Sequence, residues 1–254
     1  MRYFIKYLSY LLHSRHRHGF GIHSPYVYYL MTNVIEEELP YYKYSLIEKV
    51  RNVLLKTDEK IGVFMPNGEK KLKKIEDVVS QWSIGPKYGQ LLFRLVNYSK
   101  AKTVIEYGST SEITTMYLAA PDSKSKVLSI TNQPELADLS HSMQERIDMK
   151  NIEQMVSSDN ESVYRKLTAD GISADFIYFS RSNPSTLYQL ANLQMVPAVH
   201  KFIVIAGIHR TPAMEMVWSQ LTDNSEVKVS LDLFEVGILI LNPDLQKEKY
   251  IIYF

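Results

Sequence analysis

The sequence predicts an α/β protein in which a doubly wound, mostly parallel sheet follows a helical arm. Two observations predict this. From Pro86 onward, short apolar runs that suit buried strands alternate with segments of helical periodicity. Parallel strands need crossover connections, which are usually helices, so the alternation is typical of a doubly wound sheet. Three further strand-like runs then follow with little helix between them, and this predicts an antiparallel edge.

The chain accordingly divides into a helical N-terminal arm over residues 1–85 and an α/β domain over residues 86–254. Hydrophobic spacing within the arm predicts helices over 3–13, 26–38 and 41–56. A turn at 66–68 precedes a basic helix near 70–81. We interpret the lysines of this segment as a solvated helix face: Lys70, Lys71, Lys73 and Lys74.

In the α/β domain, an amphipathic helix over 86–96 comes before the first strand. The strand-like runs are, in order, 103–107, 127–130, 151–156, 176–179, 202–205, 227–233, 235–241 and 250–254. Helices are expected after Gly108, from Pro134, near 162–169, near 186–195 and over 213–221.

Composition excludes several classes of function. The formal net charge of +1 gives no general attraction to nucleic acid or to a membrane. The absence of cysteine excludes disulfides, thiolate metal sites and cysteine nucleophiles, and it fits a reducing compartment. The N-terminus lacks the small cleavage-site residues of a signal peptide, and no apolar run is long enough to span a bilayer. We therefore expect a cytoplasmic protein without nucleic-acid or membrane partners.

The stretch 104–115 is the first candidate site. A short strand ends at Glu106, a tight turn follows at Gly108, and hydroxyls at Ser109 and Thr110 stand where a helix needs its N-cap. Backbone N–H groups at such a turn can bind the polar end of a ligand, and the acid can accept hydrogen bonds from it. The alternative is that the hydroxyls only cap the helix.

Several motifs resemble those of class I S-adenosylmethionine (SAM)-dependent methyltransferases, and more narrowly the small-molecule O-methyltransferase branch. They are Pro-x-x-Gly-Gln-Leu-Leu at 86–92, Glu-x-Gly-(Ser/Thr) at 106–109, the closing antiparallel pair, and Arg-His-x-x-Gly-x-His-Ser-Pro at 17–25. The resemblance implies a Rossmann-like, seven-stranded sheet and a cleft for SAM. It places these residues in the cleft: Glu106, Gly108, Ser109, Thr110, Thr131 and Ser180.

The sequence departs from this pattern at the positions that carry the activity. Glu112 occupies the place of a second glycine, and Thr131 replaces the acid that binds the ribose hydroxyls. In the family the fourth strand usually ends in Asp, and here Ser180 occupies that position. The fifth strand usually ends in a pair of acids or Asp-Asn, and here Ala206-Gly207 occupies those positions. Because hard divalent cations need oxygen ligands, mostly carboxylates, no metal site of the family's type is expected.

Three other groups of residues invite functional hypotheses. His209 follows the fifth strand and is a candidate general base, but no carboxylate neighbours it in sequence, so we interpret it as a packing or hydrogen-bonding residue. Asp232 and Glu235 are expected at a solvated hairpin end. The N-terminal histidines are interpreted as part of a solvated loop: His13, His16, His18 and His23.

Two functional hypotheses remain open. The first is a methyltransferase-like pseudoenzyme with an eroded SAM site, which acts by binding a partner or a small molecule. The second is an active, metal-independent, SAM-dependent O-methyltransferase, for which SAM would be the cofactor. Many of the 18 tyrosines lie in the arm, and because tyrosine is enriched at interfaces, homodimerisation through the arm is expected.

Overall fold

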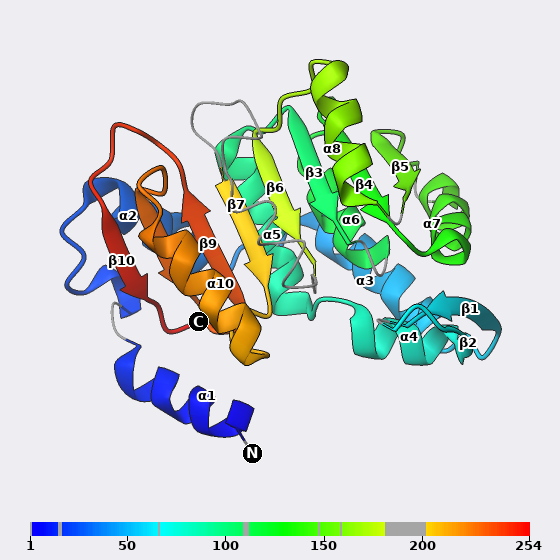
Figure 1. Cartoon of the computed structure of the whole chain (residues 1–254), viewed down its shortest axis with the longest axis horizontal. Coiled ribbons are helices and arrows are strands. Elements are labelled where there is room, and N and C mark those ends of the chain that lie inside the picture. Colours follow the sequence, from blue (N-terminus) through cyan, green and yellow to red (C-terminus); the bar gives the residue numbers. More distant parts are fainter. Residues whose placement is uncertain are drawn as a thin grey trace. The chain divides into compact units, whose positions relative to one another are not determined.

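The structure is a computed structural model that describes residues 2–14, 17–65, 67–108, 112–146, 148–157, 159–180 and 202–254 (Figure 1). These residues form two compact units. The central unit comprises residues 39–163, and the terminal unit comprises residues 1–38 and 164–254. The predicted arm thus contributes to both units, and its status as a separate domain stays a prediction.

The central unit contains three parallel strands in the order β3 (Thr103–Tyr107), β4 (Lys126–Thr131) and β5 (Ile152–Val156). The crossover helices are α6 (Glu112–Ala119) and α7 (Pro134–Arg146), as parallel pairing requires. The unit also holds α3 (Tyr42–Leu54), α4 (Ile75–Trp82) and α5 (Pro86–Ser99), and α8 (Asn160–Ala169) begins in it. The alternation of strands and helices predicted from the sequence is confirmed here.

Helices α5 and α6 pack closely because Gly89 has no side chain. A Cβ atom at Gly89 would lie 2.5 Å from the ring of Tyr117, so any larger residue would push the two helices apart. The ring of Tyr117 belongs to a core cluster with Tyr44 and Phe93, and its hydroxyl donates to Glu48 Oε1 at 2.7 Å. The helix predicted before the first strand is therefore part of the core.

The prediction of a basic helix near 70–81 is wrong for its first half. Residues Lys70–Lys74 form strand β2, which pairs antiparallel with β1 (Lys60–Phe64), and the helix α4 begins only at Ile75. Two of these lysines form ion pairs with glutamates. Lys70 Nζ lies 2.6 Å from Glu135 Oε1, and Lys74 Nζ lies 3.1 Å from Glu76 Oε1. These partners favour an extended conformation of a segment whose local propensity favours a helix.

The described residues of the terminal unit form five strands in the order β10-β8-β9-β7-β6. Their bounds are β6 (Phe176–Phe179), β7 (Phe202–Ala206), β8 (Val229–Asp232), β9 (Val236–Ile240) and β10 (Glu248–Ile251). Strand β9 runs antiparallel to both β7 and β8, as predicted. Strand β10 is parallel to β8, so the prediction that all three late strands form an antiparallel edge is wrong for the last one.

The direction of β10 follows from long-range contacts. Its register places Glu248 opposite Val229 and Ile251 opposite Asp232, and Ile252 N then donates to Asp232 O at 2.8 Å. Ile252 is fully buried, whereas β10 alternates between partly buried and exposed residues, as an edge strand does. The parallel register thus brings the buried Ile252 next to the end of β8.

Among its described residues, the terminal unit holds most of α8 and also α1 (Arg2–His13), η1 (Arg17–Gly19), α2 (Pro25–Leu30), the π-helical segment η2 (Met31–Ile35) and α10 (Pro212–Asp223). Helix α10 begins at the N-cap Thr211, whose Oγ1 accepts from Met214 N at 3.1 Å, and Pro212 starts its first turn. In Figure 1, α10 lies in front of the strands of this unit. None of the helices in the described ranges has the length and hydrophobicity that a membrane crossing requires.

Candidate functional site

Glu106 lies at the carboxyl end of β3, fully buried and bound to hydroxyls of its own unit. Its Oε2 accepts from Thr115 Oγ1 at 2.5 Å and from Ser129 Oγ at 3.1 Å. Thr115 belongs to α6 and Ser129 to β4, so the carboxylate ties helix, strand and turn together. Gly108 follows with φ 73°, a left-handed conformation that glycine adopts without strain. This acid thus has a structural role inside the sheet.

Glu112 opens α6 and is only 2% exposed. Within the described residues, neither of its carboxyl oxygens has a hydrogen-bond partner. Burial raises the pKa of Glu112 to about 7, and the nearby charge of Glu106 also raises it. The partial positive charge of a helix N-terminus favours the ionised form, but here the desolvation of the carboxylate is the larger effect.

Thr131 ends β4 and is buried. Its Oγ1 accepts from Gln133 N at 3.1 Å, which is the geometry of a local cap. Gln133 in turn binds both main-chain groups of Phe64: Oε1 accepts from Phe64 N at 2.7 Å, and Nε2 donates to Phe64 O at 2.9 Å. The end of β4 is therefore occupied by contacts with the β1–β2 hairpin, which sequence analysis missed.

The predicted cleft residues in the described ranges belong to different units. Glu106, Gly108 and Thr131 lie in the central unit, while Ser180 follows β6 in the terminal unit and is buried. Ser109 and Thr110 lie outside the described residues, as do the predicted helix near 186–195 and His16. In the part of the chain that the structure describes, no three His, Asp or Glu side chains are grouped as a metal site would need.

His209 occupies the second candidate site, in the terminal unit. Its Nε2 lies 2.7 Å from Asp232 Oδ2, and its ring stacks on Phe234 with centroids 5.2 Å apart. No carboxylate neighbours His209 in sequence, but Asp232 reaches it from another strand. Asp232 comes from the end of β8, which runs parallel to β7 on the far side of β9, so both strand ends lie at one edge of the sheet.

The prediction that Asp232 is a solvated hairpin residue is wrong. The residue is buried, and each of its carboxylate oxygens has a partner. While Oδ2 faces His209, Oδ1 accepts from Phe234 N at 2.9 Å. That bond supports Phe234 at φ 65°, a left-handed conformation that is rare for a bulky residue. The turn thereby directs the Phe234 ring toward the tyrosines of α1, with ring centroids 5.0 Å from Tyr3 and 5.0 Å from Tyr7.

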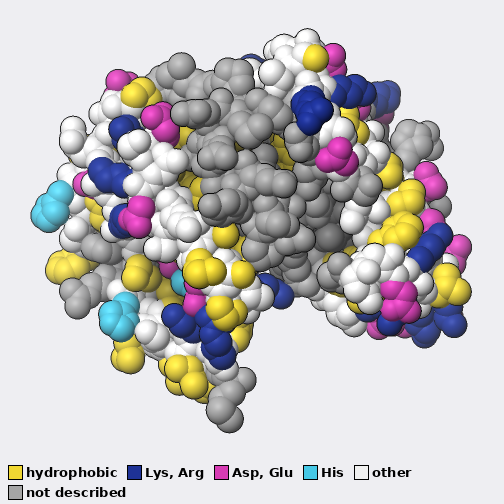
Figure 2. All heavy atoms as spheres, in the orientation of Figure 1, with side chains coloured by type: hydrophobic (Ala, Val, Ile, Leu, Met, Phe, Trp, Pro, Cys, Tyr) yellow, Lys and Arg dark blue, Asp and Glu magenta, His cyan; other side chains and the backbone are white. Residues whose placement is uncertain are grey.

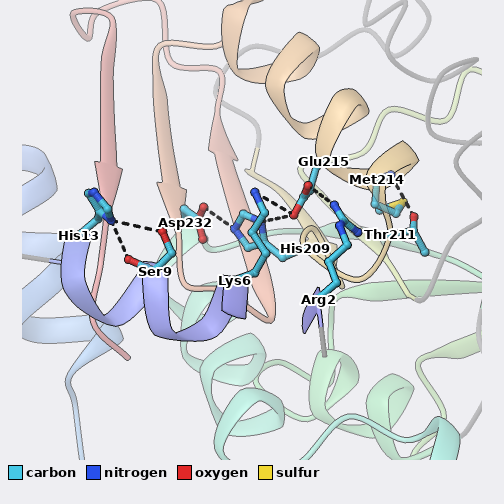
Figure 3. Close-up of polar contacts among 9 residues, drawn as sticks. All are labelled: Arg2, Lys6, Ser9, His13, His209, Thr211, Met214, Glu215 and Asp232. Atoms are coloured by element: carbon cyan, nitrogen blue, oxygen red, sulfur yellow. Dashed lines mark hydrogen bonds and ion pairs between the residues drawn. The ribbon is translucent and has the colours of Figure 1, made fainter. Parts of the chain in front are cut away.

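The other ring nitrogen of His209 faces a second carboxylate. Nδ1 lies 3.6 Å from Glu215 Oε1, too far for a hydrogen bond, and both atoms are buried. Among the described residues, neither atom has a hydrogen-bond partner. Figure 3 shows His209 between the two acids, with Arg2 and Lys6 of α1 reaching Glu215.

A histidine that is hydrogen-bonded to a carboxylate is an arrangement suited to proton transfer, because the acid orients the ring and stabilises its protonated form. Sequence analysis identified His209 but missed Asp232 and Glu215 as its neighbours. A signal was present, since Asp232 ends a strand that the antiparallel pattern makes parallel to the strand before His209, with one strand between them. Nothing local in the sequence indicated that Arg2 and Lys6 would bind Glu215.

Comparisons with known proteins show the fold. No protein family matches the sequence, and no curated protein is detectably similar to it. Among solved structures, the chain is similar to an O-methyltransferase from Bacillus cereus in complex with SAH (TM-score 0.60, 13% identity, covering 84% of this chain and 95% of that one). It is also similar to the O-methyltransferase TomG from Streptomyces achromogenes in complex with SAM (TM-score 0.57, 13% identity, 85% and 94%).

A putative O-methyltransferase from Klebsiella pneumoniae matches to the same extent (TM-score 0.57, 10% identity, 85% and 95%). At these identities the similarity concerns the fold. The chain therefore has the Rossmann-like α/β fold of SAM-dependent O-methyltransferases, as the resemblance of its motifs predicted. The described residues form eight strands of this sheet where seven were predicted, because β10 is added beside β8.

Proposed function

We propose that this chain is a methyltransferase-like binding protein that does not transfer methyl groups from SAM. The observation that carries the proposal is the buried carboxyl group of Glu112 at the start of α6. In the enzymes that the motifs resemble, a glycine at this position lets the cofactor approach. A glutamate adds bulk there, and above about pH 7 it also adds a negative charge.

The neighbouring positions support the same interpretation. The carboxylate of Glu106 is bound to the hydroxyls of Thr115 and Ser129. Thr131 offers one hydroxyl, already an acceptor for Gln133 N, where a bidentate acid would bind the ribose. The residues present in the central unit therefore do not fit SAM in the way the family binds it, and we derive no methyl-transfer step from them. A different small molecule or a protein partner remains the proposed ligand.

Calorimetry with SAM and with SAH tests the proposal. We expect no binding at millimolar ligand, whereas a Kd in the micromolar range, about −8 kcal/mol, would overturn it. The double variant Glu112→Gly/Thr131→Asp restores the two family residues, and we expect it to gain measurable affinity. A matched control is Glu76→Gly, which removes an acid from the first turn of α4 in the same unit and should leave the affinity unchanged.

A second function is favoured by one specific observation, the 2.7 Å contact between His209 and Asp232. In an active, metal-independent O-methyltransferase, SAM would supply the methyl group. The chain would contribute a proton acceptor, and because Nε2 is engaged with Asp232, that acceptor would be His209 Nδ1. Asp232 would hold the ring in the orientation that proton transfer needs.

This second function predicts methyl transfer from SAM to a panel of phenols and catechols. His209→Gln should then lower kcat by roughly 10²-fold or more, the size of a general-base contribution. The variant Lys102→Gln, which removes a surface ion pair of the central unit, serves as the control. Absence of transfer by the wild-type chain, together with absence of SAM binding, would leave the binding-protein proposal standing.

A further inference from the structure

Helix α1 presents its apolar side to solvent. Four large apolar side chains on one side of the helix are exposed: Phe4, Ile5, Leu8 and Leu12, the last by 81%. Of the residues of α1, only Tyr10 is buried. Figure 2 shows hydrophobic side chains gathered over α1, next to basic ones. A surface helix normally buries its apolar stripe, so hydrophobic burial contributes little to holding α1 in place.

The contacts that do hold α1 are polar or aromatic. Arg2 and Lys6 form ion pairs with Glu215, and their side chains are 44% and 47% exposed. Solvent and salt screen such pairs, which are therefore weak. Tyr10 is the firmer anchor, because its buried hydroxyl donates to Ile252 O and accepts from Phe254 N at 3.1 Å. Burial raises the pKa of Tyr10 above its usual range, so the hydroxyl stays protonated.

The docked helix closes over His209 Nδ1, which lacks a hydrogen bond in the described structure, and over Glu215 Oε1, which lies 3.5 Å from Lys6 Nζ of α1 itself. Buried polar atoms without partners destabilise the state that contains them, because water would satisfy them. Helix α1 also touches their neighbours, since Tyr3 and Tyr7 pack on Phe234, the ring that His209 stacks on. Displacement of α1 would let water reach both atoms.

We propose that α1 is a releasable cover over the His209–Glu215–Asp232 cluster. In the docked state, exposed ion pairs, the hydroxyls of Tyr3 and Tyr10 and the packing of tyrosine rings on Phe234 hold the helix over the buried His209 Nδ1. In the released state, His209 Nδ1 and Glu215 Oε1 face solvent and can bind a ligand with a hydroxyl or amino group, which would bridge the 3.6 Å gap. This inference does not depend on whether the chain is an enzyme, because it concerns access to the cluster.

Diethylpyrocarbonate modification of individual histidines, measured by peptide mass spectrometry, tests the proposal. His18, whose side chain is 81% exposed, is an internal reference in the same unit. We expect His209 to react much more slowly than His18 in the wild-type chain. The double variant Arg2→Gln/Lys6→Gln leaves every partner of His209 in place, and it should speed the reaction of His209 about fivefold, the effect of roughly 1 kcal/mol.

Three further measurements complete the test. Tyr10→Phe should also speed His209 modification, and hydrogen exchange over residues 2–13 should rise in both variants. Sodium chloride at about 1 M should speed the reaction in the wild type but not in the double variant. Leu12→Gln, on the exposed side of α1, is the matched control and should change nothing. If His209 reacts as fast as His18 in the wild type, or equally fast in all variants, α1 is not a cover.

Discussion

Replacing Glu112 by glutamine should change the pH dependence of stability in a defined direction. The pKa of Glu112 is raised from 4.5 to about 7 in the folded chain. Between these two values the folded state therefore binds a proton that the unfolded state has lost. The contribution of Glu112 to stability is complete below about pH 4.5, falls as the pH rises, and reaches its lowest value above about pH 7.

The magnitude follows from the two pKa values. Full ionisation in the folded state removes about 3 kcal/mol, at 1.36 kcal/mol per pKa unit. About 2.5 kcal/mol of this falls between pH 5 and pH 8. Glutamine cannot ionise, so Glu112→Gln should gain roughly that amount relative to the wild type over the same interval. The cost of burying an amide does not depend on pH and cancels in the comparison.

Urea unfolding of both chains at pH 5 and pH 8 measures the effect. Glu76→Gln is the control, because Glu76 lies at the start of α4 in the same unit, partly exposed and paired with Lys74. The difference in unfolding free energy between Glu76→Gln and the wild type should be the same at pH 5 and at pH 8. If the stabilities of Glu112→Gln and the wild type run parallel from pH 5 to pH 8, Glu112 is ionised in the folded chain and the reasoning from its burial is refuted.

Three other predictions concern single contacts, each measured by urea unfolding. Thr115→Val removes a buried hydroxyl from the carboxylate of Glu106 and should destabilise the chain by about 1–3 kcal/mol, while Thr115→Ser should restore most of it. Thr211→Ala removes the N-cap of α10 and should cost about 1 kcal/mol, with Thr211→Ser as the neutral control; equal stability of the two would contradict the cap. Asp232→Ala removes the acceptor for His209 and should cost about 2 kcal/mol or more, whereas a cost below roughly 0.5 kcal/mol would show that the contact is not stabilising.

The parallel strands could be predicted because they carry a local signal. The runs at 176–179 and 202–205 are apolar over their whole length, as strands buried on both faces are. The β1–β2 hairpin could not be predicted this way, because lysine is a good helix former and the acid that pairs with Lys70, Glu135, lies far along the chain. The direction of β10 could not be predicted either, because its partner strand β8 is set by long-range pairing and not by the local sequence.

The candidate sites show a similar division. Glu112 could be identified from its spacing after Gly108 in the sequence. Its burial could not be predicted, because burial depends on how α6 packs. His209 could be identified from its place after a strand. Its relation to Glu215 depends on the docking of α10 and α1, which no local pattern encodes. Local sequence thus identifies the acids and bases, and long-range packing decides which of them meet.

The bonds of Tyr10 to the last strand have a consequence for synthesis on the ribosome. Tyr10 and Ile252 are 242 positions apart in the chain. At about 5–20 residues per second, α1 is made roughly 12–50 seconds before the segment on which it docks. Throughout that interval Tyr10 is without its final hydrogen-bond partners, Ile252 and Phe254. The docking of α1 must therefore be among the last steps in the folding of its unit.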